Sequence, residues 1–129
     1  MLVIAKVLRV GERALMNRYS EKDWKLFRQK LPQWQESHME KLCREYLEIL
    51  CKETQPSERF WELEKRINDD KHHIGVRARM SRSNMVINIL GLIKEGVIAL
   101  DDLAGFSDEL QNHMRLIAER TSMIFDDYE

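Results

Sequence analysis

The stretch SRSNMVINILGLIKEG, residues 81–96, decides the fold because it is the most apolar run in the chain. Polar residues that favour helix starts precede it, and Gly96 follows it as a residue type that ends helices. A helix that is apolar around most of its circumference must be surrounded by other elements. We therefore predict a buried central helix at about residues 82–95.

Length and composition fit an all-α domain. The chain has 129 residues, of which 43% are hydrophobic and 33% charged, and it contains only 5 glycines and 2 prolines. Abundant charge suits exposed helix faces, and so few turn-forming residues argue against a sandwich or barrel. We expect a compact single-domain bundle of four to five helices over residues 20–125.

Residues 1–19 are predicted as an N-terminal extension of uncertain structure. Val3, Val7 and Leu8 fit a helical stripe, but the same region suits a strand equally well. Met16 stands just before the first clear helix signal, so a true start there would make the first residues an addition to the domain.

The first half of the chain contains signals for two long helices. Ser20, followed by acidic residues, favours a helix start, and Pro32 is expected to end or kink that helix. A second helix is predicted from Pro32 to about Lys52. Its spacing predicts a core-facing stripe of Met39, Leu42, Cys43, Tyr46, Ile49 and Leu50. The two cysteines, Cys43 and Cys51, are accordingly expected to be buried thiols about two turns apart, out of disulfide reach.

The second half predicts shorter elements around the central helix. Ser57 is expected to cap a helix that ends near Asp70, and residues 71–80 are expected to form a loop or a short extended piece. After Gly96, acidic residues at 101–102 indicate a single helical turn, and Ser107 begins a final helix. The expected inward residues of the two longer helices are Phe60, Leu63, Ile67, Leu110, Met114, Ile117 and Ile124.

The basic segment at residues 77–84 is the sharpest candidate site. It contains Arg77, Arg79 and Arg82 and leads into Asn84 at the start of the central helix. Such residues at a helix N-terminus can contact phosphates, and two helices joined by a short turn resemble a DNA-reading unit. The alternative is that these arginines are solvated or pair with the acidic C-terminal third. The apolar helix that follows could not lie in a groove and also serve the core.

No pattern in the chain supports catalysis or metal binding. His72 and His73 are adjacent and belong to no metal-ligand spacing, and no glycine-rich phosphate loop follows a strand. We therefore predict no catalytic residues, no metal, no cofactor and no small-molecule substrate. Three tryptophans exceed what short helices need for one core, so Trp34 and Trp61 are the candidates for a partner surface.

Several short runs resemble those of a family of small bacterial proteins commonly labelled "multidrug transporter". The runs are FWELEKRI (60–67), GV (75–76), MSRSNM (80–85), GVI (96–98), DDL (101–103) and FSDEL (106–110). The resemblance covers roughly residues 20–120 and implies a bacterial protein, with no catalytic or binding residues to carry over. A membrane helix needs about 20 apolar residues, and the longest apolar stretch here is interrupted by Asn88 and ends at Lys94. We therefore predict no membrane span.

These observations lead to two functional hypotheses. The first is a non-enzymatic, cytoplasmic interaction or regulatory protein that binds a protein partner or its own copy. The alternative is a helix-turn-helix-like regulator that binds nucleic acid through residues 77–84.

Overall fold

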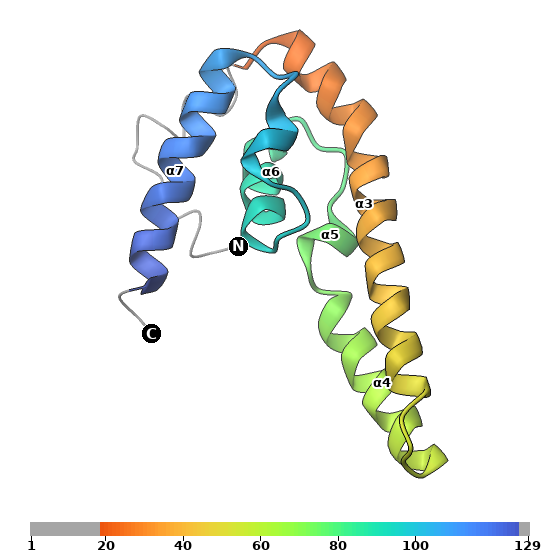
Figure 1. The fold of residues 1–129 in the computed structure, drawn as a ribbon. Helices are drawn as coiled ribbons and strands as arrows, with labels where there is room; N and C mark the ends of the chain where they lie inside the picture. The colour runs from red at the N-terminus through yellow and green to blue at the C-terminus, as the bar shows by residue number, and fades with distance from the viewer. Residues whose placement is uncertain (1–18, 127–129) are drawn as a thin grey trace.

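The computed structural model describes residues 19–126, with side chains up to residue 120. Its elements are α3 (Glu21–Leu50), α4 (Pro56–Asp70), α5 (Ile74–Arg77), α6 (Met85–Lys94), the 3-10 turn η1 (Leu100–Leu103) and α7 (Asp108–Asp126). Within that range every element is helical, which confirms the predicted all-α class (Figure 1). The predicted N-terminal extension falls almost entirely on residues 1–18, outside the described part.

Helix α6 is the centre of the core. It lies between α7 on one side and α3 with α5 on the other (Figure 1), and Val86, Ile89 and Leu92 are completely buried. Lys94, at its last position, is its one exposed residue. Gly96 then adopts a φ of 75°, a left-handed conformation that glycine reaches without steric cost. The predicted central helix and its terminating glycine are both confirmed.

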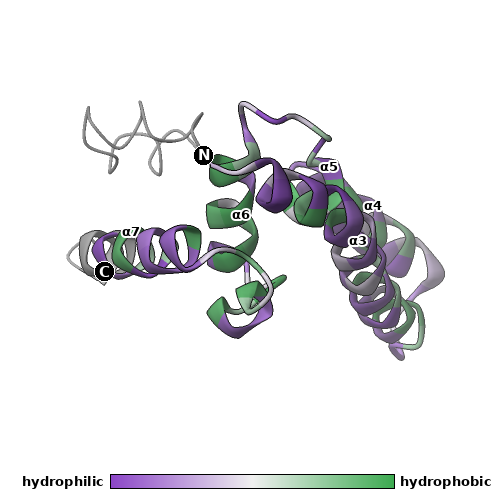
Figure 2. Cartoon of the chain, turned by 90° about the horizontal axis from the view of Figure 1, so that it is seen from above, coloured by the Kyte–Doolittle hydropathy of each residue, from purple (hydrophilic) through white to green (hydrophobic). Residues whose placement is uncertain are grey.

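The surrounding elements each contribute fully or nearly fully buried side chains to α6. They are Phe27 and Leu31 of α3, Ile74 of α5, Leu103 of η1, and Leu110, Met114 and Ile117 of α7. Packing against α5 is close, because a Cβ built on Gly91 would lie 2.8 Å from Cδ1 of Ile74. Figure 2 shows the result as a green, apolar α6 next to helices whose colour alternates between their two faces.

A buried carboxylate joins the N-terminal ends of α3 and α7. Asp23 is only 2% exposed, and it accepts hydrogen bonds from the Ser107 backbone N–H at 2.8 Å and the Ser107 hydroxyl at 2.6 Å. The same hydroxyl accepts from the N–H of Leu110 at 3.3 Å, within the first turn of α7. Asp23 therefore fixes the residue that caps α7, 84 positions along the chain.

Helix α3 runs through Pro32 without ending, which makes the predicted boundary there wrong. Proline removes one backbone donor and normally breaks or kinks a helix. Here the ring is exposed, so the backbone carbonyl that loses its partner can be hydrated. Packing on both sides of Pro32, through Leu31 and Leu42, holds α3 as one helix of 30 residues.

Helices α3 and α4 form an antiparallel hairpin that extends away from α6 and α7 (Figure 1). Gln55 is the N-cap of α4 and gives it no side-chain cap, and Pro56 occupies its first turn. Helix α5 follows within the region that was predicted as a loop. It is a single turn whose N–H groups at Ile74 and Gly75 donate to the carboxylate of Glu95 at 2.9 and 3.0 Å.

We predict that Asp23→Ala lowers the free energy of unfolding by about 2–3 kcal/mol, because it leaves the buried Ser107 N–H and hydroxyl without an acceptor. Urea unfolding followed by circular dichroism measures this change. Asp69→Ala is the matched control, since Asp69 is exposed near the end of α4. Equal stability of the two variants would contradict the role given to Asp23.

Candidate functional site

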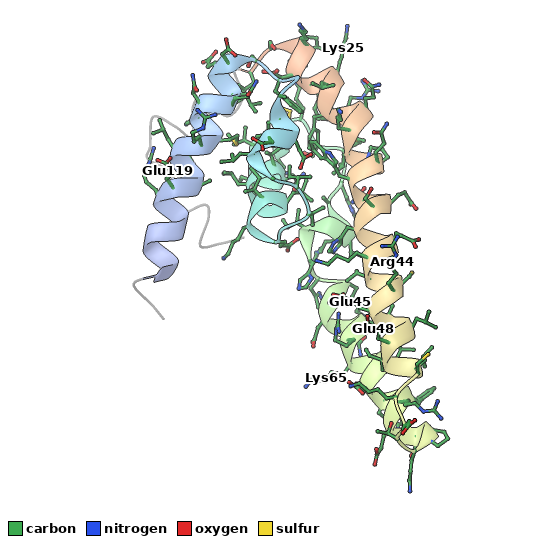
Figure 3. All side chains as sticks on the ribbon, in the orientation of Figure 1. Lys25, Arg44, Glu45, Glu48, Lys65 and Glu119 are labelled. Atoms are coloured by element: carbon green, nitrogen blue, oxygen red, sulfur yellow. The ribbon has the colours of Figure 1, made fainter. Side chains whose placement is uncertain are left out.

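One face of the α3–α4 hairpin is charged. Two ion pairs join the two sides of the hairpin there: Arg66 of α4 pairs with Glu45 of α3 at 3.1 Å, and Lys52, just after α3, pairs with Glu62 of α4. Figure 3 labels Glu45, Glu48 and Lys65 along this side of the hairpin. Exposed pairs of this kind contribute little to stability, so their main effect is to keep this face polar.

The opposite face of the hairpin is apolar and exposed. Spacings of three or four residues place one row of side chains along α3, and a spacing of seven places Phe60 and Ile67 on the same side of α4. The apolar row of α3 and the apolar row of α4 both lie beside the contact between the two helices, on the side away from the ion pairs. The two rows therefore share one surface. We call it the hairpin face. It consists of Met39, Cys43, Leu47, Leu50, Phe60 and Ile67, together with Trp61, which adjoins them because its ring packs edge to face on Phe60.

The hairpin face concentrates the exposed apolar surface of the molecule. Eight large hydrophobic side chains are exposed in the described residues, and all but Met80 and Leu116 belong to this face. Phe60 and Trp61 are 60% and 63% exposed, with their rings edge to face and their centroids 4.9 Å apart. Contiguous apolar surface of this kind is typical of interaction sites.

The two tryptophans predicted as a partner surface lie in different environments. Trp61 is exposed on the hairpin face. Trp34 is half-buried, stacked on Phe106 at 6.3 Å and edge-on to Phe27 at 6.4 Å between ring centroids. Its indole therefore serves the packing between α3 and the segment before α7, and only Trp61 remains a candidate for partner contact.

Several side chains of the hairpin were predicted to face the core and do not. The stripe on α3 divides: Leu42 and Ile49 are buried, whereas Met39, Cys43 and Leu50 are exposed. Cys51 is exposed as well, so the expectation of buried thiols is wrong for both cysteines. Phe60 and Ile67 of α4 are likewise exposed. The physical reason is that α3 is the main neighbour of α4, and the contact between two helices is too narrow to cover both apolar rows.

The basic segment forms a second candidate site. Arg77, Arg79 and Asn84 line one hollow of about 390 Å³, together with His72, Ser81 and Asn88 among others. Arg82 does not line it and instead pairs with Glu21, at the start of α3, at 2.6 Å. Glu21 lies outside the acidic C-terminal third, which was the predicted source of acidic partners. Since α6 is buried in the core, it could not enter a DNA groove as a recognition helix.

A polar cluster around Asp70 connects α3 to the end of α4. The Tyr46 hydroxyl donates to Asp70 at 2.7 Å, and Arg66 lies 3.5 Å from the same carboxylate. Burial, together with the hydrogen bond to Asp70, raises the pKa of Tyr46 to about 12. The phenol therefore keeps its proton and acts as a donor, which makes this cluster a structural link between the helices.

His38 lies next to this cluster and was not singled out in the sequence. The ring of His38 is buried, and its Nε2 has no hydrogen-bond partner in the described part of the chain. The ring also packs against Gly75 so closely that a Cβ added to Gly75 would lie 2.6 Å from Cδ2 of His38. Burial lowers the pKa of His38, and Glu95 partly opposes that effect. A neutral imidazole is therefore favoured in the fold.

The described residues contain no group of three or more His, Cys, Asp or Glu side chains that could hold a metal ion. None of the described helices is long and apolar enough to cross a membrane. No family model, no curated protein and no solved structure matches the chain. Any function must therefore be inferred from the hairpin face and the basic hollow themselves.

We predict that the free energy of unfolding decreases as the pH falls below about 6.5, the ordinary pKa of histidine. The lowered pKa of His38 means that the unfolded chain binds a proton there before the folded chain does, so stability is complete above pH 6.5 and is lost as the pH falls toward the lowered value. Urea unfolding at a series of pH values measures the slope, and His38→Gln should reduce it. The control, His72→Gln, changes an exposed ring and should retain the slope of the unaltered protein; an unchanged slope in His38→Gln would contradict the argument.

Proposed function

We propose that the chain is a non-enzymatic, cytoplasmic interaction protein that pairs with a second copy of itself through the hairpin face. The observation that carries this proposal is the clustering of six of the eight exposed large apolar side chains between Met39 and Ile67. They lie on one side of two antiparallel helices, with the interhelical ion pairs on the other side.

Pairing with an identical hairpin suits this geometry. Two antiparallel helices with a shared apolar face amount to half of a four-helix bundle, and a second hairpin supplies the missing half. A two-fold axis through the face would let each copy use the same residues, so one surface is enough to close the assembly. The 15 residues of α4 provide a contact about 22 Å long.

The exposed area is also of the right size. The large side chains of the hairpin face expose on the order of 600 Å², at the upper end of the largest patches on ordinary monomers. A standard interface buries about 800 Å² on each partner, a size that this patch and its polar rim together approach. The edge-to-face pair Phe60 and Trp61 supplies large rigid rings of the type that dominate interface energies.

The arrangement of titratable groups supports a role without catalysis. Asp70 accepts from Tyr46 and pairs with Arg66, and Asp23 is occupied by Ser107, so these buried carboxylates are used within the fold. Cys43 and Cys51 are exposed free thiols, and a reducing compartment maintains cysteines in that form.

Nucleic-acid binding through residues 77–84 is the weaker alternative. The arginines Arg77 and Arg79 remain free to contact phosphate, but Arg82 is paired with Glu21 and the helix behind the segment is buried. Only two arginines of this segment could therefore contact phosphates, whereas proteins that bind duplex DNA usually neutralise several.

We predict that the protein forms a concentration-dependent dimer and that Leu47→Glu abolishes it, because a carboxylate at the interface would have to be buried unpaired. Leu116→Glu is the matched control: Leu116 is 54% exposed on α7, against 61% for Leu47. Size-exclusion chromatography with light scattering over a range of concentrations measures the mass. A monomer at every concentration, or equal disruption by both variants, would overturn the proposal.

A further inference from the structure

The hollow between the end of α4 and the start of α6 is strongly basic. Arg77 and Arg79 line it along with His72, and it contains no acidic residue. Within the described residues neither arginine has an ion-pair partner, in contrast to Arg82, which is held by Glu21. Two unneutralised guanidinium groups around one concave surface create a positive potential that favours an anion.

The backbone that forms the hollow is fixed by side chains from two helices. Gln35 of α3 donates to the carbonyl of Ala78 at 2.9 Å, and Asn88 of α6 donates to the carbonyl of Arg79 at 3.3 Å. Asn88 is itself 7% exposed, so the second of these bonds is anchored in the core. The two arginines therefore project from a positioned segment, which reduces the entropy that a ligand must offset.

The polar lining adds directional groups to this charge. Asn84 is the N-cap of α6 but gives it no side-chain cap, and its amide nitrogen donates to the Ser81 hydroxyl at 3.1 Å. The positive end of the α6 dipole is thus left without a side-chain acceptor next to the hollow. A ligand oxygen would complete this arrangement, while Ser81 and Asn84 could bond to hydroxyl groups of the same ligand.

We propose that this hollow binds a small phosphorylated molecule, with Arg77 and Arg79 holding its phosphate. A guanidinium group bonds a phosphate in bidentate fashion, which makes phosphate the anion that best uses two adjacent arginines. The volume of about 390 Å³ suits a ligand of the size of a sugar phosphate and lies in the range of small-molecule sites. No Phe, Tyr or Trp ring lines the hollow, so the phosphate and the hydroxyl groups provide the recognition. This proposal does not depend on pairing through the hairpin face.

The test is a titration of the full chain with ribose phosphate at physiological ionic strength, followed by two-dimensional amide NMR. We expect saturable shifts confined to residues 72–88, and a loss of affinity of at least about tenfold in the double variant Arg77→Gln/Arg79→Gln. Arg115→Gln, at an exposed position of α7, is the matched control and should bind like the unaltered chain. Both arginines of the double variant are exposed, so circular dichroism should show an unchanged fold.

Three further titrations identify what the hollow recognises. Ribose alone should not bind, and inorganic phosphate should bind more weakly than ribose phosphate at the same residues. A duplex DNA that binds with steep salt dependence while ribose phosphate does not would assign the arginines to nucleic acid instead and overturn the proposal. Dissociation constants for ribose phosphate weaker than about 10 mM, or equal affinity in the double variant, would also overturn it.

Discussion

The rest of the structure depends on the burial of α6. This helix of ten residues is apolar on nearly every side, and a single neighbour can cover only one stripe of a helix. Elements from both ends of the chain must therefore converge on it, and α3, α5, η1 and α7 do so with side chains such as Phe27, Leu103 and Met114. The Asp23–Ser107 contact holds the beginnings of the two longest of these elements together.

This requirement also explains why the hairpin is left with an exposed apolar face. Only the first half of α3 reaches α6, since its later turns are occupied with α4. Helix α4 covers Leu42 and Ile49 and is attached through Tyr46 and Asp70, but nothing in the described chain covers the adjoining row from Met39 to Leu50. Helix α3 thus belongs to the core at its N-terminal end and to a candidate interface at its C-terminal end. The basic hollow lies where these two parts meet.

The sequence predicted the elements better than their environments. Signals that act locally predicted several features correctly. An apolar run predicted α6, a glycine predicted its end at Gly96, and capping residues predicted the turn at Leu100–Leu103 and the start of α7. Apolar spacing predicted the buried residues Leu110, Met114 and Ile117 of α7. The helix boundary predicted at Pro32 is wrong, because packing on both sides of the proline holds α3 together as one helix. The predicted burial of Phe60 and of the two cysteines is wrong. Periodicity shows that a helix has an apolar stripe, but it does not show whether another element covers that stripe. Of the four residues predicted to bind nucleic acid, three line the hollow, but the pairing of Arg82 with Glu21 joins distant segments and leaves no local signal.

Hydrogen–deuterium exchange at a series of protein concentrations tests most directly whether α6 is the closed core and the hairpin face the open one. The account predicts that amides of residues 85–94 exchange slowest at every concentration, because their exchange requires opening of the core. It predicts that protection of residues 39–67 increases as the concentration rises, because pairing covers the hairpin face and stabilises the folded chain. Hairpin protection that is independent of concentration, or faster exchange in α6 than in the surrounding helices, would contradict it.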